Sequence, residues 1–241
     1  MEKDGFGEVE IVPLTRIQKI VAGRLSRNWA TIPHVTHHDE ADITEIEALR
    51  GEMAARPWTS SESNVRISLL PFVIKAVVAA LRANPRLNAS LDGGGVNVIL
   101  KRYFNIGVAI DTPGGLVVGV IRGCEHKDVS QIADEIARLS HKAREKGLSL
   151  DEMSGGCFTV SSLGGIGGRA FTPIINAPEV AILGVAKALW TATRANDGAI
   201  SWRLMLPLSL SYDHRVVNGA DAARFMRSLV NTLSTFDGIV G

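Results

Sequence analysis

The stretch Ser211-Tyr212-Asp213-His214-Arg215-Val216-Val217-Asn218-Gly219 joins an apolar run, Leu204 to Tyr212, to an amphipathic run, about Ala220 to Leu233. The apolar run predicts a strand and the amphipathic run a helix, with Asn218-Gly219 supplying the turn before the helix. A histidine at such a strand end is exposed while its backbone is held, so His214 is a candidate general base. The alternative is a hydrogen-bonded histidine with a structural role.

Strand and helix patterns alternate irregularly along the rest of the chain. Asp128 and Gln131 form a capping box that begins a long amphipathic helix. Further helices are expected after Thr15, after Thr44 and over 69–83, and strands over 34–42, 96–100, 104–110, 116–121, 158–162 and 179–188. Because the order lacks strict strand–helix–strand alternation, the sequence predicts one α/β domain with a mixed sheet over residues 1–241. Residues 1–12 are expected to form a tail and an entering strand.

The composition excludes several classes of protein. The chain has 241 residues, 46% of them hydrophobic, so it is long enough to form a core and too apolar to be disordered. Its 26 Lys and Arg residues nearly balance 25 Asp and Glu residues, which predicts no nucleic-acid or anionic membrane partner. No segment is long and apolar enough to span a bilayer, and two cysteines fit a reducing compartment. We therefore expect a cytoplasmic protein.

Three other motifs in the sequence are candidate functional sites, but none of them is expected to form one. His34, His37 and His38 resemble a metal cluster, but on one strand His34 and His38 face the side opposite to His37, so no metal site is expected. Cys157 lies in an apolar strand pattern, which indicates a buried thiol rather than a nucleophile. The glycine-rich loop 164–168 lacks the spacing of a dinucleotide-binding motif. Ser161 and Ser162, in the strand before it, do not lie in the Gly-x-Ser-x-Gly nucleophile elbow of hydrolases.

The His214 segment resembles the signature of the dihydrolipoyl acyltransferases, the core components of the 2-oxoacid dehydrogenase complexes, and more distantly the His-x-x-x-Asp-Gly signature of chloramphenicol acetyltransferases. Five more segments resemble family segments in family order: Ile32 to Thr36, Asp39 to Thr44, Asp111 to Leu116, Phe158 to Gly164 and Pro178 to Gly184. They are most similar to the acetyl-transferring, pyruvate-type members. The resemblance implies an α/β, chloramphenicol acetyltransferase-like two-layer fold, in which helices pack against a mixed β-sheet.

The resemblance also implies a reaction, the transfer of an acetyl group between a lipoyl-lysine thioester and the thiol of coenzyme A. A thiol with a pKa of about 8.5 is mostly protonated at neutral pH, so a base that removes its proton accelerates attack by about 10²- to 10⁴-fold. The family pattern gives this role to His214. It assigns a hydroxyl donor for the oxyanion to Ser161, and Ser162 is the alternative because neighbouring strand residues point to opposite faces.

Two positions depart from the family pattern. Asn218, which we group with His214 and Ser161 as a catalytic candidate, stands where the broader family more often has an aspartate paired with an arginine. The resemblance places that arginine at Arg16, whose alternative role is a solvated helix-face side chain. We expect Arg16, Asn218 and Gly219 to support the turn that holds His214. Gly119 stands where members usually have proline, and we expect it to loosen its strand locally.

Family members also imply an assembly. They form homotrimers whose active sites combine a histidine of one subunit with a serine of the next, and the trimers build 24-mer or 60-mer cores that bind 2-oxoacid decarboxylase and dihydrolipoamide dehydrogenase components. No lipoylation turn or Ala/Pro-rich linker precedes Glu8. We therefore expect an isolated catalytic core without lipoyl and partner-binding domains, with coenzyme A as substrate and the lipoyl group supplied by another domain. The alternatives are a catalytically silent scaffold and an acetyltransferase for a small hydroxyl or amine acceptor.

Overall fold

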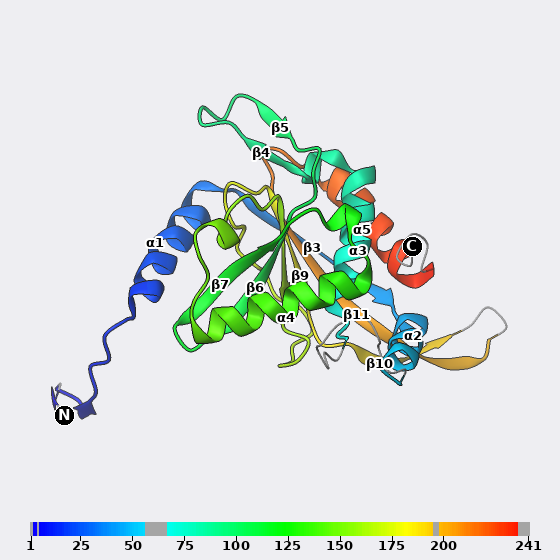
Figure 1. Cartoon of the computed structure of the whole chain (residues 1–241), viewed down its shortest axis with the longest axis horizontal. Coiled ribbons are helices and arrows are strands. Elements are labelled where there is room, and N and C mark those ends of the chain that lie inside the picture. Colours follow the sequence, from blue (N-terminus) through cyan, green and yellow to red (C-terminus); the bar gives the residue numbers. More distant parts are fainter. Residues whose placement is uncertain (1, 4, 56–66, 195–197, 236–241) are drawn as a thin grey trace.

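A twisted mixed sheet forms the centre of the computed structural model, which describes residues 2, 3, 5–55, 67–194 and 198–235 (Figure 1). The helices are α1 (Arg16–Thr31), α2 (Thr44–Ala55), α3 (Leu70–Ala83), α4 (Val129–Glu145) and α5 (Gly219–Thr235). The strands are β1 (Glu2–Lys3), β2 (Glu8–Val9), β3 (His34–Asp42), β4 (Ala89–Leu91), β5 (Val98–Leu100), β6 (Ile106–Thr112), β7 (Gly115–Ile121), β8 (Phe158–Ser162), β9 (Ala181–Val185), β10 (Leu189–Arg194) and β11 (Ile200–Asp213).

The long strand β11 organises the sheet. β3 pairs with one edge of β11, and β9 and β10 pair one after the other with its other edge, all antiparallel. From β9 the sheet continues through β8 and β6, which are parallel to it, to the antiparallel strand β7. The predicted mixed sheet is therefore confirmed. The strand predicted over 179–188 is shorter in the structure, where β9 spans Ala181–Val185, and the strand β10, which begins at Leu189, was not predicted.

One face of the sheet is apolar and is covered by helices. Alternate residues of β11, namely Leu206, Leu208 and Leu210, are buried on this face together with Phe158 of β8. Helices α3, α4 and α5 pack over them, and α4 is seen in front of the sheet in Figure 1. Phe158 also lies against Phe225 of α5, with ring centroids 5.7 Å apart. Each large side chain buried in this way contributes about 1.5–3 kcal/mol, so this layer supplies most of the stability.

The opposite face of the sheet carries small and polar side chains. On β11 these are Ser209 and Ser211, which lie next to His38 and Thr36 of β3. The hydroxyl of Ser209 is 2.9 Å from His38 Nδ1, and that of Ser211 is 2.9 Å from Thr36 Oγ1. Both serines are buried, so these hydrogen bonds offset the loss of contact with water.

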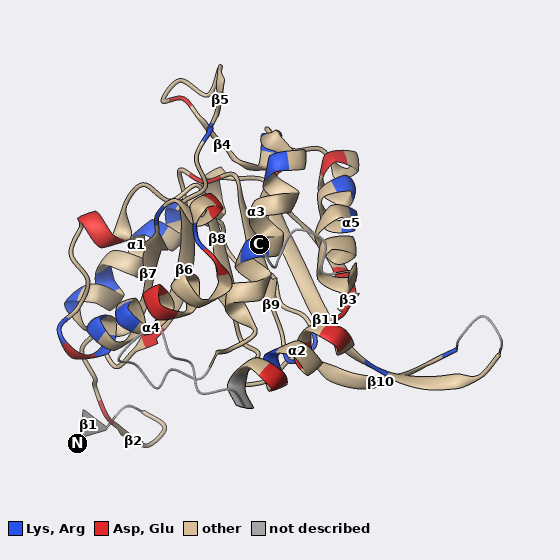
Figure 2. Ribbon diagram, turned by 45° about the vertical axis from the view of Figure 1, so that its right-hand side comes forward, with Lys and Arg blue, Asp and Glu red and all other residues tan. Residues whose placement is uncertain are grey.

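Two parts of the chain project from the body: the N-terminal segment with α1, and the hairpin of β10 and β11 (Figures 1 and 2). Both carry exposed apolar side chains, Ile20 and Trp29 on α1 and Trp190 and Trp202 on the hairpin. Figure 2 shows that residues of both charges, Lys and Arg as well as Asp and Glu, are distributed along the helices. Within the part of the chain that the structure describes, no helix combines the length and apolar character needed to cross a membrane.

Candidate active site

His214 lies in the turn after β11, and the backbone around it is hydrogen-bonded to neighbouring segments. The amide of His214 donates to the carbonyl of Pro33 at 3.1 Å, and the amide of Asp213 donates to that of Val180 at 2.8 Å. The imidazole is exposed, with its centroid 5.9 Å from that of the Tyr212 ring. The turn therefore presents an accessible imidazole on a held backbone, as the sequence predicts, and this is the geometry that a general base needs.

A charged pair that the sequence analysis did not single out fixes the same turn. The buried carboxylate of Asp213 accepts hydrogen bonds from Nε and Nη2 of Arg215, at 2.9 and 2.6 Å, and from the Arg215 amide at 3.0 Å. The hydrogen bond with Asp213 raises the pKa of Arg215. Such bidentate pairs are among the stronger polar contacts in proteins. The available signal was the pair of opposite charges on either side of His214.

Asn218 begins the helix that follows the turn. Its side-chain oxygen accepts a hydrogen bond from the amide of Asp221 at 2.9 Å, so it caps α5, which begins at Gly219. Arg16 is exposed at the start of α1. The hydroxyl of Thr15, just before it, donates to the carbonyl of Gly114 in the β6–β7 turn at 2.9 Å. The structure shows no hydrogen bond or ion pair between Arg16 and Asn218, both of which it describes. The role of Arg16 in supporting the His214 turn stays a prediction.

The two serines at the end of β8 point to opposite faces of the sheet, as predicted. Ser161 pairs with Gly184 of β9 on the polar face and is half-buried. Among the described residues, its hydroxyl has no hydrogen-bond partner. Ser162 pairs with Val185 on the other face, and its hydroxyl accepts a hydrogen bond from Gly164 N at 3.4 Å. The hydroxyl of Ser161 is therefore the freer of the two to donate to a substrate.

Within one chain, Ser161 and His214 lie at opposite ends of the sheet. Ser161 is in register with Gly184 of β9, which is in register with Ser209 of β11. His214 follows Ser209 by five residues, which corresponds to about 17 Å along a strand, and two strand spacings add about 9 Å across it. No side-chain rotation closes this gap, so a single chain does not bring the two predicted residues together.

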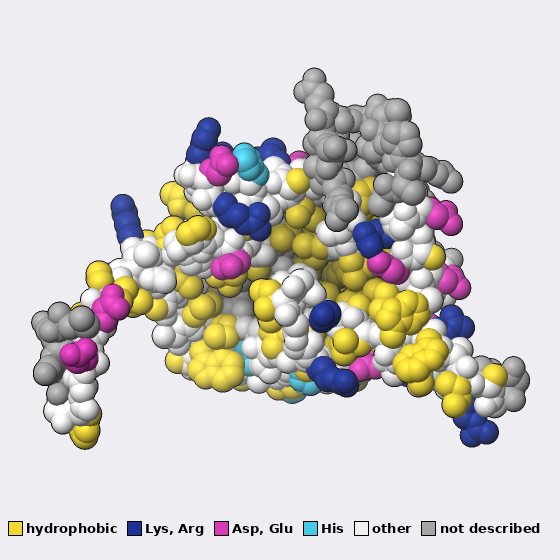
Figure 3. Space-filling model, turned by 90° about the horizontal axis from the view of Figure 1, so that it is seen from below, with side chains coloured by type: hydrophobic (Ala, Val, Ile, Leu, Met, Phe, Trp, Pro, Cys, Tyr) yellow, Lys and Arg dark blue, Asp and Glu magenta, His cyan; other side chains and the backbone are white. Residues whose placement is uncertain are grey.

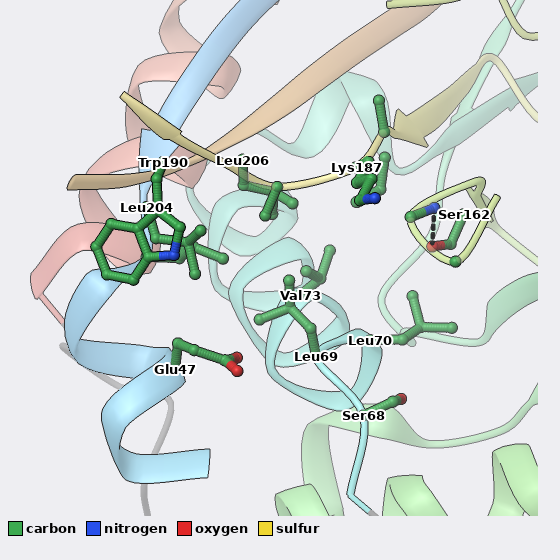
Figure 4. Close-up of a pocket in the computed structure, with 16 residues that line it drawn as sticks. Glu47, Ser68, Leu69, Leu70, Val73, Ser162, Lys187, Trp190, Leu204 and Leu206 are labelled. Carbon is green, nitrogen blue, oxygen red and sulfur yellow. Dashed lines mark hydrogen bonds between the residues drawn. The ribbon is translucent and has the colours of Figure 1, made fainter. Parts of the chain in front are cut away.

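A cavity of about 610 Å³ opens beside the end of β8 (Figure 4). Its wall is largely apolar and includes Leu69, Leu70, Val73, Leu204 and Leu206. Ser162 and Lys187 lie at one end, and Glu47 and Trp190 at the other. Figure 3 shows a hollow with hydrophobic side chains in the molecule's surface. A cavity of this size and lining suits an extended organic substrate arm.

The structure describes two rival candidates from the sequence, the histidines of β3 and Cys157. His34 and His38 pair with Asp213 and Ser209 on one face of the sheet, whereas His37 pairs with a leucine on the other, as predicted. The residues that the structure describes contain no group of side chains suited to hold a metal ion. Cys157 is buried, and burial raises the pKa of its thiol to about 12, so it does not serve as a thiolate nucleophile.

Gly119 allows close packing rather than loosening its strand. It lies within β7, and a Cβ atom at this position would come within 3.1 Å of Leu148, 3.2 Å of Ile110 and 3.4 Å of Leu139. The missing side chain therefore leaves room for a helix and a loop to close over the strand. The expectation of a locally loosened strand is wrong, because tertiary contacts fill the space that the glycine leaves.

This arrangement defines an acyltransferase fold. The structure is similar to chloramphenicol acetyltransferase with a TM-score of 0.58 at 16% identity, covering 88% of this chain and 94% of that chain. The family of 2-oxoacid dehydrogenase acyltransferases, catalytic domain, matches residues 6–240. The chain belongs to this family.

Relatives with higher sequence identity agree with that assignment. The chain is 52% identical to the dihydrolipoyllysine-residue acetyltransferase component of the pyruvate dehydrogenase complex of Cupriavidus necator, over 98% of this chain and 41% of that protein. Two solved structures are each 50% identical to this chain, with a TM-score of 0.92. Each match covers 97% of this chain and 95% of the solved chain. One is the cubic core of a pyruvate dehydrogenase multienzyme complex. The other is the dihydrolipoamide acetyltransferase of Azotobacter vinelandii, studied for the role of a serine, a histidine and an asparagine in its catalytic mechanism. The chain spans about two fifths of the length of three curated relatives that it matches, among them the Cupriavidus necator protein.

Proposed function

We propose that this chain transfers an acetyl group between the thioester of a lipoyl-lysine arm and the thiol of coenzyme A, within a pyruvate-type 2-oxoacid dehydrogenase complex. The observation that carries this proposal is the turn at His214, where a family signature presents an exposed imidazole on a hydrogen-bonded backbone. Family membership and the likeness to the Azotobacter vinelandii acetyltransferase support the same reaction.

The proposed mechanism uses His214 as base and Ser161 as oxyanion donor. An imidazole nitrogen takes the proton of the coenzyme A thiol while the sulfur attacks the acetyl carbonyl carbon. The hydroxyl of Ser161 donates to the oxyanion that forms, which is typically worth about 3–4 kcal/mol. The intermediate then breaks the bond between carbon and the lipoyl sulfur, and the proton held by His214 passes to that sulfur as it leaves. Asn218 and Gly219 hold the turn through the start of α5.

We propose that the complete site forms between two copies of the chain. The separation of Ser161 and His214 along the sheet supports this, because either residue needs a neighbouring chain to supply the other. A homotrimer satisfies the requirement with three equivalent head-to-tail interfaces. The trimers in turn are proposed to build a 24-mer or 60-mer core that binds the decarboxylase and dihydrolipoamide dehydrogenase components, and the likeness to a cubic core supports this.

The two substrates are proposed to reach the site as long flexible arms. Coenzyme A brings its thiol on a pantetheine chain, and the lipoyl group arrives on a lysine of another domain. The largely apolar cavity lies on the Ser162 face of β8, opposite to Ser161, so neither arm is assigned to it while Ser161 is the proposed donor.

A subunit-mixing experiment tests both the reaction and the shared site. His214→Ala and Ser161→Ala chains with different tags are expressed alone and together, and transfer between acetyl-CoA and dihydrolipoamide is measured. Each variant alone is expected to be nearly inactive. Random mixed trimers should recover about a quarter of the wild-type sites, because a site then works only when an intact histidine meets an intact serine.

The controls separate this proposal from its alternatives. Capture on one tag must retain the other chain, which shows that mixed oligomers form. Mixed oligomers without recovered activity would overturn the shared site. A wild-type chain without any transfer activity would identify a scaffold, and acetylation of a small hydroxyl or amine acceptor without activity toward dihydrolipoamide would indicate a different acetyltransferase.

A further inference from the structure

The carboxyl group of Glu179 is buried between β8 and β9, and the mechanism above gives it no role. Only 4% of the residue is exposed. Its Oε2 accepts a hydrogen bond from Thr159 Oγ1 at 2.6 Å, and its Oε1 accepts one from Asn176 Nδ2 at 3.2 Å. Glu179 lies just before β9 and Thr159 lies on β8, so this carboxyl joins the two parallel strands at their start.

The surrounding backbone is shaped to hold this pair. A Cβ atom at Gly156 would lie 2.9 Å from Glu179 Oε1, and one at Gly107 would lie 2.6 Å from Thr159 Oγ1. Neither position therefore has room for a side chain while the carboxyl and the hydroxyl keep their places. Glycine at both positions leaves the space that the hydrogen-bonded pair fills.

Few charges face the Glu179 carboxyl. The charged group that acts on it is Lys101, whose Nζ donates to the carbonyl of Gly156 at 3.2 Å, and the nearby titratable group is the buried thiol of Cys157. Burial raises the pKa of Glu179 to about 7, against the hydrogen bonds from Thr159 and Asn176 and the charge of Lys101, which lower it. Both protonation states are therefore populated near neutral pH.

We propose that Glu179 is a positioning residue for Ser161, that it acts through Thr159, and that its hold is strongest when the carboxylate is ionised. This inference rests on the function proposed above. Thr159 and Ser161 are alternate residues of β8 and share the polar face of the sheet. Fixing Thr159 therefore fixes the register that places Ser161 beside Gly184. At Gly184 a Cβ atom would meet the ring of Phe171 at 2.7 Å, so a small shift of the strands disturbs the surroundings of the donor.

The direction of one hydrogen bond explains the dependence on charge. The amide nitrogen of Asn176 only donates, so Oε1 of Glu179 is an acceptor in both states. A proton on the carboxyl therefore lies on Oε2, where it is donated to Thr159 and reverses that hydrogen bond. The hydroxyl proton of Thr159 then loses the carboxylate as its acceptor. Because Thr159 is fully buried, water does not replace that acceptor. In the ionised state Thr159 donates to a charged oxygen, a bond roughly twice as strong as a neutral one.

The variant Glu179→Gln reproduces the neutral acid at every pH. Its amide oxygen has to face Asn176, so its amide nitrogen donates to Thr159. We expect the ratio of wild-type to variant kcat to rise from near one at pH 6 to about fivefold at pH 8, with an unchanged KM for acetyl-CoA. A purely structural role would give a ratio that does not change with pH, and that result would overturn the proposal.

A pair of Thr159 variants provides an independent test, including the case in which Glu179→Gln fails to fold. Thr159→Val keeps the shape and removes the hydroxyl, so it should lower kcat at pH 8 by a similar factor. Thr159→Ser keeps the hydroxyl and should restore the wild-type rate and pH profile. Wild-type behaviour of the valine variant, or no rescue by serine, would also overturn the proposal.

Hydrogen exchange separates a failure of this inference from a failure of the proposed function. The ratio of the protection factors of the β8 amides to those of the β11 amides should be higher at pH 8 than at pH 6 in the wild-type chain and equal at the two pH values in Glu179→Gln. The ratio is used because it cancels the change in global stability that ionisation of Glu179 causes. This readout needs no enzymatic activity. An equal ratio at the two pH values in the wild-type chain would contradict the positioning role of Glu179 even where acetyl transfer is observed.

Discussion

The turn at His214 and the strand end at Ser161 hold their proposed functional groups in different ways. The turn is fixed by backbone hydrogen bonds, an ion pair between buried Asp213 and exposed Arg215, and a capped helix, while the imidazole itself is exposed. At the strand end the hydroxyl is half-buried and is placed by strand register and close packing. A base that exchanges protons with substrates needs access, whereas a donor to an oxyanion needs a fixed position with little water around it.

The largest expected effect tests the turn. His214→Ala should lower kcat for transfer between acetyl-CoA and dihydrolipoamide roughly a thousandfold, because the attacking thiol loses its base. The turn is held by backbone hydrogen bonds rather than by the ring, so the oligomer and the temperature of unfolding should be unchanged. Wild-type turnover in this variant would remove His214 from the mechanism.

The next effect tests the strand end. Ser161→Ala should lower kcat by roughly 10² to 10³ with little change in KM, because the lost hydrogen bond forms with the transition state. Ser162→Ala is the matched variant on the opposite face and should lose less than about tenfold by the same measure. The reverse order of the two effects would assign the donor to Ser162 and place the reacting carbonyl on the cavity side of β8.

The buried carboxyl of Glu179, which contacts Thr159 of β8, should also affect the free energy of unfolding. The pKa of Glu179 is raised from 4.5 to about 7 by burial, so the folded chain binds more protons than the unfolded chain between these pH values. Stability from this group is therefore present below pH 4.5 and is lost as pH rises to about 7, a change of about 3 kcal/mol. Denaturant unfolding at one protein concentration measures this change. The free energy of unfolding of Glu179→Gln minus that of the wild type should rise by about 3 kcal/mol between pH 4.5 and pH 7. A constant difference would contradict the buried, titrating carboxyl.

The smallest effect tests the cap of the turn. Asn218→Ala should lower the free energy of unfolding by about 1 kcal/mol, because the amide of Asp221 loses its acceptor. Asn218→Asp keeps a side-chain oxygen in the same place and should retain wild-type stability and turnover. A loss of turnover in the aspartate variant with unchanged stability would show that Asn218 does more than cap α5.

Local patterns in the sequence predicted much of the fold. The strand predicted from the apolar run Leu204 to Tyr212, which lies within β11, and the Asp128–Gln131 capping box of α4 are both confirmed. The strand β10 was missed because Leu189–Arg194 is mostly exposed and becomes a strand through its pairing with β11. At Gly119 the sequence indicated looseness, whereas three leucine and isoleucine side chains close over the glycine.

For the site, the sequence by itself determined that Ser161 and Ser162 point to opposite faces, because this follows from the two-residue period of a strand. Its resemblance to a known family predicted His214 as base and Ser161 as donor, with Ser162 as the alternative, and these roles stay predictions. Only the tertiary structure decided that His214 and Ser161 lie at opposite ends of one sheet, and that a buried glutamate reaches the strand of the serine. Strand order and burial arise from contacts between segments far apart in the chain, which no local pattern specifies.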